Sequence, residues 1–197
     1  MKTSPIKNIL ERVRVFQESK FLELKKHFQK LEKQQNPEIL WITCSDSRID
    51  PHLITQSQPG TLFITRNIGN MVPPFDSQDP YMGGVLEFAI HALGIKHIII
   101  CGHSDCGAMK AIKDETIFSQ NFNSVSRWLN SIHQKLKNHK NLIHSLDELI
   151  YQNVSLQIDH LRTYPILKDK NVEIYGWVYN IGNGTIEDYQ TRKNIVI

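Results

Sequence analysis

The chain of 197 residues contains 40% hydrophobic and 22% charged residues, and it carries a formal net charge of +3 at pH 7. These values are typical of a soluble globular protein and exclude an intrinsically disordered chain, which would have too few apolar residues to form a core. The longest apolar runs, such as Ile98–Cys101, are far shorter than the roughly 20 residues of a membrane-spanning helix.

The opening segment MKTSPIKNILERVRVF mixes charged residues with apolar ones, so it does not match a secretory signal. Three cysteines, an odd number, form a poor disulfide framework and indicate reduced thiols that are available for metal binding or catalysis. We therefore expect a cytoplasmic protein. Lysines cluster between Lys20 and Lys33, but Glu23 and Glu32 interrupt them, which indicates a solvated helix face. We expect neither a nucleic acid nor a membrane as a partner.

Residues 1–36 are predicted to form an N-terminal helical arm that ends before Pro37. Apolar residues recur there at helical spacing in two groups: Ile6, Ile9, Leu10 and Val13, then Phe21, Leu24, Phe28 and Leu31. The apolar face of this arm must pack either on its own domain or on a second subunit. The spacing alone does not distinguish the two.

From residue 37 onward, apolar runs typical of buried strands alternate with helical patterns. The runs predict strands at 39–43, 61–65, 97–101 and 172–179, followed by a terminal hairpin element after Gly184. Helical spacing predicts helices over 82–93, where Gly94 ends the helix, over 125–136 and over 146–161. The alternation predicts an α/β fold with a mostly parallel β-sheet flanked by helices. We expect one domain over 1–197, with the sheet core and the C-terminal helices and strands in 37–197.

Two predicted strands run into residues that can bind a metal. The first is followed by CSDSR at 44–48, and the third leads into CGHSDCG at 101–107. Because neighbouring parallel strands end at the same edge of a sheet, we expect both loops on one rim. Two thiols, an imidazole and a carboxylate would then converge, which is the ligand set of a tetrahedral zinc site.

Taken singly, these residues have plainer interpretations. Cys44 could be a small buried hydrophobe, and His103 could be a structural histidine. We expect Cys101 to pack in the core and Asp105 to cap a helix that begins beside it. The combination of HxxC at one strand end with CxD at the other is what favours zinc binding.

The two loops together resemble the signatures of β-class carbonic anhydrases. The similarity extends to RNIGN at 66–70, VLEFA around Glu87, NVSLQIDHLRTYP from Asn153 and GWVYNIGNG from Gly176, and it spans about residues 35–188. RNIGNMVPPF and CGHSDCGAMK are most similar to plant and cyanobacterial members. The resemblance implies a homodimer or an assembly of dimers, and it favours packing of the N-terminal arm on the dimer partner.

The resemblance implies that Cys44, His103 and Cys106 bind one Zn²⁺ per subunit, and that Asp46 and Arg48 form a catalytic dyad. The implied activity is the reversible hydration of carbon dioxide to bicarbonate and a proton by zinc-bound hydroxide. Two thiolates leave bound Zn²⁺ formally neutral, so the metal would acidify water less than a tris-histidine site does. We expect Asp46 to accept a hydrogen bond from the nucleophile and Arg48 to hold that carboxylate ionised and oriented.

The resemblance also implies residues that bind substrate. Gln35 occupies a position where the family binds substrate across the dimer interface, and Phe63 and Ile68 match residues that line the carbon dioxide pocket. Phe88 occupies a position where some plant members have a tyrosine, so it would contribute no hydroxyl.

Asp46 has a second role in some members of the family, where the aspartate leaves the arginine and becomes a fourth zinc ligand. Those members bind bicarbonate at a separate site, and Trp41, Arg66 and Tyr179 match its residues, although Thr43 replaces a glycine. The plainer interpretation, which we favour, makes Trp41 and Tyr179 core aromatics and Arg66 an interface ion-pair partner.

Two other functions stay open from the sequence. The same metal site could act on carbonyl sulfide or carbon disulfide, and a non-catalytic zinc protein or bicarbonate sensor would belong to a different class. Asp46 and Arg48 argue against the non-catalytic protein, because a purely structural zinc needs neither.

Overall fold

The computed structural model describes residues 4–77, 79–116, 123–137, 145–168 and 170–196. The chain divides into two compact units, Met1–Asn36 and Pro37–Ile197. Within the described ranges, every helix is too short or too polar to cross a membrane.

The N-terminal unit is helical, as the apolar spacing predicts. It consists of α1 (Pro5–Val15), a π-helical turn η1 (Phe16–Lys20), α2 (Phe21–Glu23) and α3 (Lys25–Leu31). Phe16, Phe21 and Phe28 cluster with ring centroids 5.5 to 6.2 Å apart, which packs α3 against the preceding turns. α1 has no buried residue, and its apolar side chains stay exposed: Ile6, Ile9, Leu10 and Val13.

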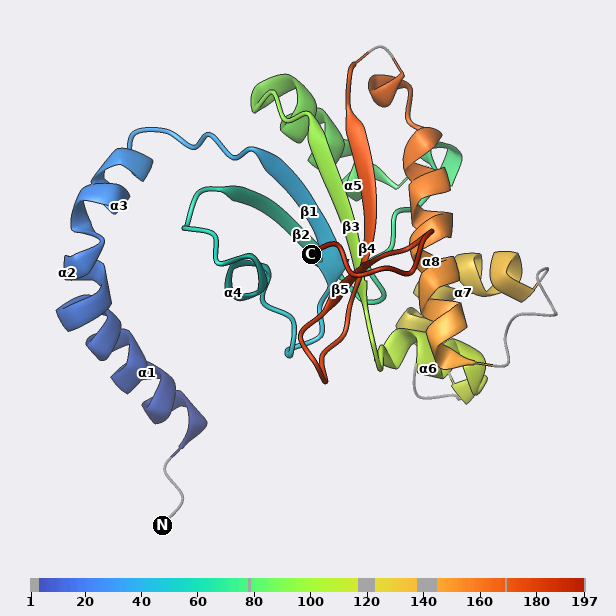
Figure 1. Ribbon diagram of the computed structural model, residues 1–197, viewed down its shortest axis with the longest axis horizontal. Coiled ribbons are helices and arrows are strands. Elements are labelled where there is room, and N and C mark those ends of the chain that lie inside the picture. Colours follow the sequence, from blue (N-terminus) through green and yellow to red (C-terminus); the bar gives the residue numbers. More distant parts are fainter. Residues whose placement is uncertain (1–3, 78, 117–122, 138–144, 169, 197) are drawn as a thin grey trace. The chain divides into compact units, whose positions relative to one another are not determined.

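The second unit is built on a five-stranded sheet with the strand order β2-β1-β3-β4-β5 (Figure 1). β1 (Ile39–Cys44), β2 (Leu62–Asn67), β3 (His97–His103) and β4 (Glu173–Tyr179) run parallel. β5 (Ile186–Asp188) pairs with β4 in the antiparallel direction. The predicted mostly parallel sheet is confirmed, and β3 continues past its predicted end as far as His103.

Helices flank this sheet, and α6, α7 and α8 lie together beside it (Figure 1). The connecting elements are α4 (Pro51–Thr55), η2 (Phe75–Ser77), α5 (Pro80–Glu87), η3 (Phe88–Ala92), α6 (Gly107–Lys113), α7 (Asn123–Lys137), α8 (Leu146–Arg162) and η5 (Pro165–Leu167). The side chains of Asp50, Asp79 and Ser145 accept backbone hydrogen bonds at the starts of α4, α5 and α8. Gly94 has a φ of +68°, which suits its predicted role after the helix end.

Alternation along the strands divides their side chains between two clusters. The larger cluster joins the strands to α5, α6 and α8, and its strand members include Leu40, Ile42, Ile98 and Ile100. The smaller cluster is formed by the intervening residues Trp41, Leu62, Ile99 and Cys101. Cys101 is therefore a core residue, as predicted.

The pairing of β1 with β3 positions the functional loops. The register aligns Thr43 with Cys101, so Cys44 and His103 follow at the same edge of the sheet. A short loop, residues 104–106, joins the end of β3 to the start of α6. The strand ends thus meet on one rim, as the parallel arrangement predicts.

Candidate metal centre

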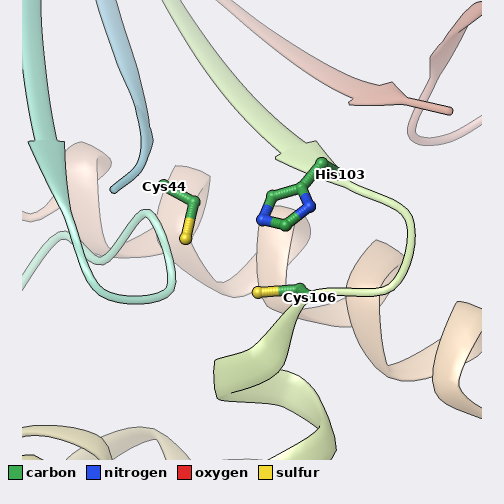
Figure 2. A group of neighbouring side chains, drawn as sticks. All are labelled: Cys44, His103 and Cys106. Carbon is green, nitrogen blue, oxygen red and sulfur yellow. The ribbon is translucent and has the colours of Figure 1, made fainter. Parts of the chain in front are cut away.

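Cys44, His103 and Cys106 converge at the carboxyl ends of β1 and β3 (Figure 2). One potential ligand atom from each residue lies within 4.8 Å of the other two, and all three residues are buried. Cys44 ends β1, His103 ends β3, and Cys106 directly precedes α6. The structure therefore brings the three predicted ligands together.

The hydrogen bonding of His103 leaves one ring nitrogen available for a metal. Nδ1 lies 2.9 Å from the backbone oxygen of Ser104, and because a carbonyl only accepts, Nδ1 is the donor. Nε2 is buried and makes no hydrogen bond to any described residue. Burying a nitrogen without a partner is costly, and a bound metal ion would satisfy it. Two sulfurs with one imidazole nitrogen are a donor set that suits Zn²⁺.

The thiols of Cys44 and Cys106 influence each other. A hydrogen bond from the Cys106 thiol lowers the pKa of Cys44 to about 4, and nearby His103 and the backbone N–H groups of Gly69 and Asp46 act in the same direction against burial. The same contact with Cys44, followed by burial, raises the pKa of Cys106. Only a positive charge placed between the sulfurs would let both be thiolates at neutral pH. The cluster is therefore suited to a cation.

Asp46 and Arg48 form a two-pronged ion pair beside this cluster. Arg48 Nε donates to Asp46 Oδ1 at 2.9 Å, and Nη2 donates to Oδ2 at 2.8 Å. The backbone N–H of Arg48 also donates to Oδ1 at 2.9 Å. These contacts with Arg48 hold the pKa of Asp46 well below its usual range, with burial opposing the shift. In this structure the Asp46 carboxylate is engaged by Arg48, and its role as a fourth metal ligand stays a prediction.

Asp105 does not cap a helix, so that prediction is wrong. The residue in the N-cap position of α6 is Cys106, which makes no side-chain cap hydrogen bond. Asp105 has a φ of +59°, whereas a capping residue usually has an extended backbone. Its carboxylate instead pairs with Lys110 and with Arg48, and these two contacts, in that order, lower its pKa.

Arg66 holds the backbone of the loop after β1. Its Nε donates to the carbonyl oxygen of Cys44 at 3.1 Å, and its Nη2 donates to that of Asp46 at 2.7 Å. Arg66 thereby anchors the segment that carries one predicted metal ligand and the dyad carboxylate. Trp41 is fully buried, and Tyr179 packs against the same small cluster, as their interpretation as core aromatics predicts.

Two buried polar side chains on α8, Asn153 and Gln157, support the loop after β2, and no sequence pattern predicted this role. Asn153 Nδ2 donates to the carbonyl oxygen of Gly69 at 3.0 Å, and Gln157 accepts a hydrogen bond from the backbone N–H of Val72 at 2.8 Å. Gln157 also donates to the Asn153 side-chain oxygen at 2.8 Å. Gly69 in turn presents its N–H to Cys44. The sequence does contain a signal that could have identified these two residues: they are polar and lie four positions apart, on a helix face that otherwise carries apolar residues.

Two of the predicted substrate-binding residues, Phe63 and Phe88, are brought together by the structure. The rings of Phe63 and Phe88 are in contact, with centroids 5.8 Å apart and planes tilted by 36°. Ile68 is exposed on the loop after β2, where its carbonyl oxygen accepts a hydrogen bond from Trp128 Nε1 at 2.8 Å. Gln35 lies in the other unit, in an exposed segment after α3. The roles of these residues in binding substrate stay predictions.

Comparison with known proteins identifies the family. A family model described as carbonic anhydrase matches residues 39–186. A carbonic anhydrase of Synechococcus elongatus is 37% identical over 193 residues, which cover 92% of this chain and 70% of the relative. The solved structure of the β-carbonic anhydrase CcaA has a TM-score of 0.88 at 33% identity and covers 98% of this chain and 92% of its own. One of two tetrameric β-carbonic anhydrases from Sordaria macrospora has a TM-score of 0.84 at 30% identity, with 93% of this chain and 95% of that chain covered. The chain therefore belongs to the carbonic anhydrase family, in its β class.

Proposed function

We propose that the protein catalyses the reversible hydration of carbon dioxide to bicarbonate and a proton, with one Zn²⁺ per subunit held by Cys44, His103 and Cys106. The observation that carries this proposal is the position of the Asp46–Arg48 ion pair, whose carboxylate lies 4.0 Å from His103 Nε2. A structural zinc site is closed by four protein ligands and has no need of a carboxylate–guanidinium pair at its edge. Membership of the family supports the same activity.

Zn²⁺ bound in this cluster would supply Lewis acidity, which makes water acidic enough to lose a proton near neutral pH. The task of Asp46 is to accept a hydrogen bond through Oδ2 and so to orient the attacking oxygen. Arg48 stops the carboxylate from rotating, because Nε and Nη2 each hold one of its oxygens. Since its pKa is lowered, Asp46 stays an acceptor throughout the neutral range.

We propose that Phe63, Phe88 and Ile68 line the approach of carbon dioxide, and that Gln35 binds substrate from the partner subunit. Carbon dioxide is uncharged and has no net dipole, so an apolar wall holds it by excluding water. The ring contact between Phe63 and Phe88 supports such a wall. Bicarbonate is an anion, so the same wall favours its release into water.

The active form on this proposal is a homodimer or an assembly of dimers, in which residues 1–36 pack on the partner. Support comes from α1, which has no buried residue and presents four exposed apolar side chains at helical spacing. Such a helix is stabilised mainly by packing its apolar face on another surface. The similar protein from Sordaria macrospora is tetrameric. Residues 1–197 would then act as one functional domain.

The cysteines support a reducing compartment. Cys44, Cys101 and Cys106 are all free, and two of them are proposed metal ligands that a disulfide would remove. We therefore propose a cytoplasmic location, which cell fractionation would test.

Stopped-flow measurement of carbon dioxide hydration by the purified zinc-loaded protein tests the proposed activity, with carbonyl sulfide as a competing substrate. We expect hydration that is lost on chelation and restored by Zn²⁺. Faster turnover of carbonyl sulfide or carbon disulfide than of carbon dioxide would identify that compound as the substrate instead. A zinc-bound protein with no turnover of any of them would overturn the proposal in favour of a structural or sensing role.

A further inference from the structure

Arg48 has a second acidic partner, Asp105, on the loop between β3 and α6. Its Nη1 donates to Asp105 Oδ2 at 3.0 Å, and its Nη2 donates to the backbone oxygen of Asp105 at 3.2 Å. The pair with Asp46 uses Nε and Nη2. Every guanidinium nitrogen therefore has an acceptor, and the side chain bridges the loop after β1 to the loop after β3.

Asp105 is itself held by Lys110, which lies on α6. The Lys110 ammonium pairs with Oδ1 of Asp105, so Oδ2 is left to face Arg48. The backbone N–H of Lys110 donates to the carbonyl oxygen of Cys106 at 2.9 Å, which fixes the lysine in the helix. The left-handed backbone of Asp105, with φ of +59°, suits Asp and Asn better than most residues. Four side chains thus form a series of ion pairs in which negative and positive charges alternate, from Asp46 through Arg48 and Asp105 to Lys110.

We infer that Asp105 and Lys110 are positioning residues. They hold the Arg48 guanidinium in the orientation in which its Nε and Nη2 hydrogen-bond to the Asp46 carboxylate. This inference rests on the proposed function of the Asp46–Arg48 pair. The Arg48 side chain is 43% exposed, so little packing restrains its several rotatable bonds. With Asp46 alone, the guanidinium and the carboxylate could swing together, whereas Asp105 ties Nη1 to a second, separate loop.

The exposure of these residues indicates an effect on orientation rather than on folding. The side chains of Asp105 and Lys110 are 49% and 47% exposed, and exposed ion pairs contribute little to the free energy of unfolding. A carboxylate that must direct a hydrogen bond is sensitive to small displacements. Loss of Asp105 should therefore lower the turnover rate without removing the metal.

The variant Asp105→Asn tests this, because asparagine keeps the size of the side chain and tolerates the left-handed backbone. In the zinc-loaded enzyme we expect kcat to fall about two- to fivefold, with unchanged KM and zinc content. Lys110→Met should lower kcat by less, and Lys110→Arg should restore it. Asp114→Asn and Lys113→Met are matched controls, because these residues pair at 3.4 Å near the other end of α6.

Two further measurements separate positioning from other roles. In an Arg48→Gln background, adding Asp105→Asn should cause no further loss of kcat, because Asp105 acts only through Arg48. In the nuclear magnetic resonance spectrum of the ¹⁵N-labelled protein, Asp105→Asn should speed rotation of the Arg48 Nη groups. Additive loss of kcat, or rotation unchanged by the substitution, would overturn the inference.

The outcomes also distinguish this inference from the proposed function. If the wild-type protein hydrates carbon dioxide and Asp105→Asn matches it in both kcat and Arg48 rotation, the inference is wrong and the proposed function stands. If the wild-type protein does not hydrate carbon dioxide, the proposed function fails, and the rotation rate still decides whether Asp105 positions Arg48.

Discussion

Oδ2 of Asp46 lies 4.0 Å from Nε2 of His103, which is near enough to border the metal centre but too far for a hydrogen bond. Arg48 explains this separation, because its Nη2 holds the same oxygen at 2.8 Å. The carboxylate is therefore held by Arg48, whereas the imidazole is held through Nδ1 by the backbone oxygen of Ser104. Removing the ion pair should consequently affect the reaction without dismantling the metal cluster.

The dyad variants test this separation directly. Asp46→Ala and Arg48→Ala should each retain zinc and lower kcat for carbon dioxide hydration by about 100-fold or more, because the first removes the acceptor that orients the nucleophile and the second removes the side chain that holds this acceptor. Stopped-flow kinetics and elemental analysis on the same preparations provide both readouts. Arg162→Ala is a control, since that arginine pairs with Asp159 on the surface of α8. A fully active, zinc-loaded dyad variant would refute the role.

Metal content should depend on Cys106 and not on Cys101. Cys106→Ala is expected to lose both bound zinc and activity, because it removes one of two sulfur ligands. Cys101→Ala is the matched control: burial raises the pKa of that thiol to about 12, and the residue packs in the small core cluster. Elemental analysis of both variants gives the answer. Stoichiometric zinc in Cys106→Ala would contradict its assignment as a ligand.

Metal binding should release about one proton per ion at pH 7. In the metal-free protein Cys44 is already ionised, because the Cys106 thiol lowers its pKa to about 4, whereas the raised pKa of Cys106 keeps its proton in place. Since binding releases a proton, raising the pH favours the bound state, and affinity should rise about tenfold per pH unit. Calorimetric titration in buffers of different ionisation enthalpy counts the protons. Release of no proton would contradict this account of the thiol pair, and any proton beyond the first would come from metal-bound water.

A side chain at Gly102 should destabilise the fold, because β3 and α8 approach closely beside His103. A Cβ at this position would lie 2.8 Å from Cγ2 of Val154. Gly102→Ala is expected to lower the free energy of unfolding by about 1–3 kcal/mol. Gly83→Ala should instead raise it by about 0.5–1 kcal/mol, because that position lies in α5 with open space around it. Denaturant titration measures both, and an equal response would argue against close packing at Gly102.

Assembly should depend on the apolar face of α1. Leu10→Glu is expected to reduce the oligomer mass measured by light scattering, because it places a charge among the exposed apolar residues of that face. Asn8→Glu adds the same charge on the opposite side of the helix and should leave the mass unchanged. Equal masses for the two variants and the wild type would remove the support for a docking role of this face.

The sheet and the metal cluster could be predicted because both follow from simple patterns. Strands buried on both faces read as continuous apolar runs, which is the case for 39–43 and 97–101. Parallel pairing then forces the carboxyl ends of β1 and β3 to one edge, and with them Cys44 and His103. The helix α4 (Pro51–Thr55) is too short to show a period, so no pattern predicted it.

The surroundings of the cluster could not be predicted, because they depend on loop backbone and on distant contacts. Beside a helix start Asp105 resembles a cap, but its φ of +59° does not suit a capping residue, and its carboxylate pairs with Arg48 and Lys110 instead. Arg66 reaches the backbone of Cys44 from the neighbouring strand, which its own segment does not indicate. Asn153 is recognisable as part of a helix, but its hydrogen bond to Gly69 joins parts of the chain far apart in sequence.

The hydrogen-bonded register of β1 with β3 has a thermodynamic consequence for the metal. Because strand pairing brings Cys44 and His103 to the same edge of the sheet, we expect the donors to be assembled before any ion arrives. The ion is then expected to enter a chain that is already folded and to add stability in proportion to its occupancy. In this respect we expect the protein to differ from small zinc domains, which fold only around their metal.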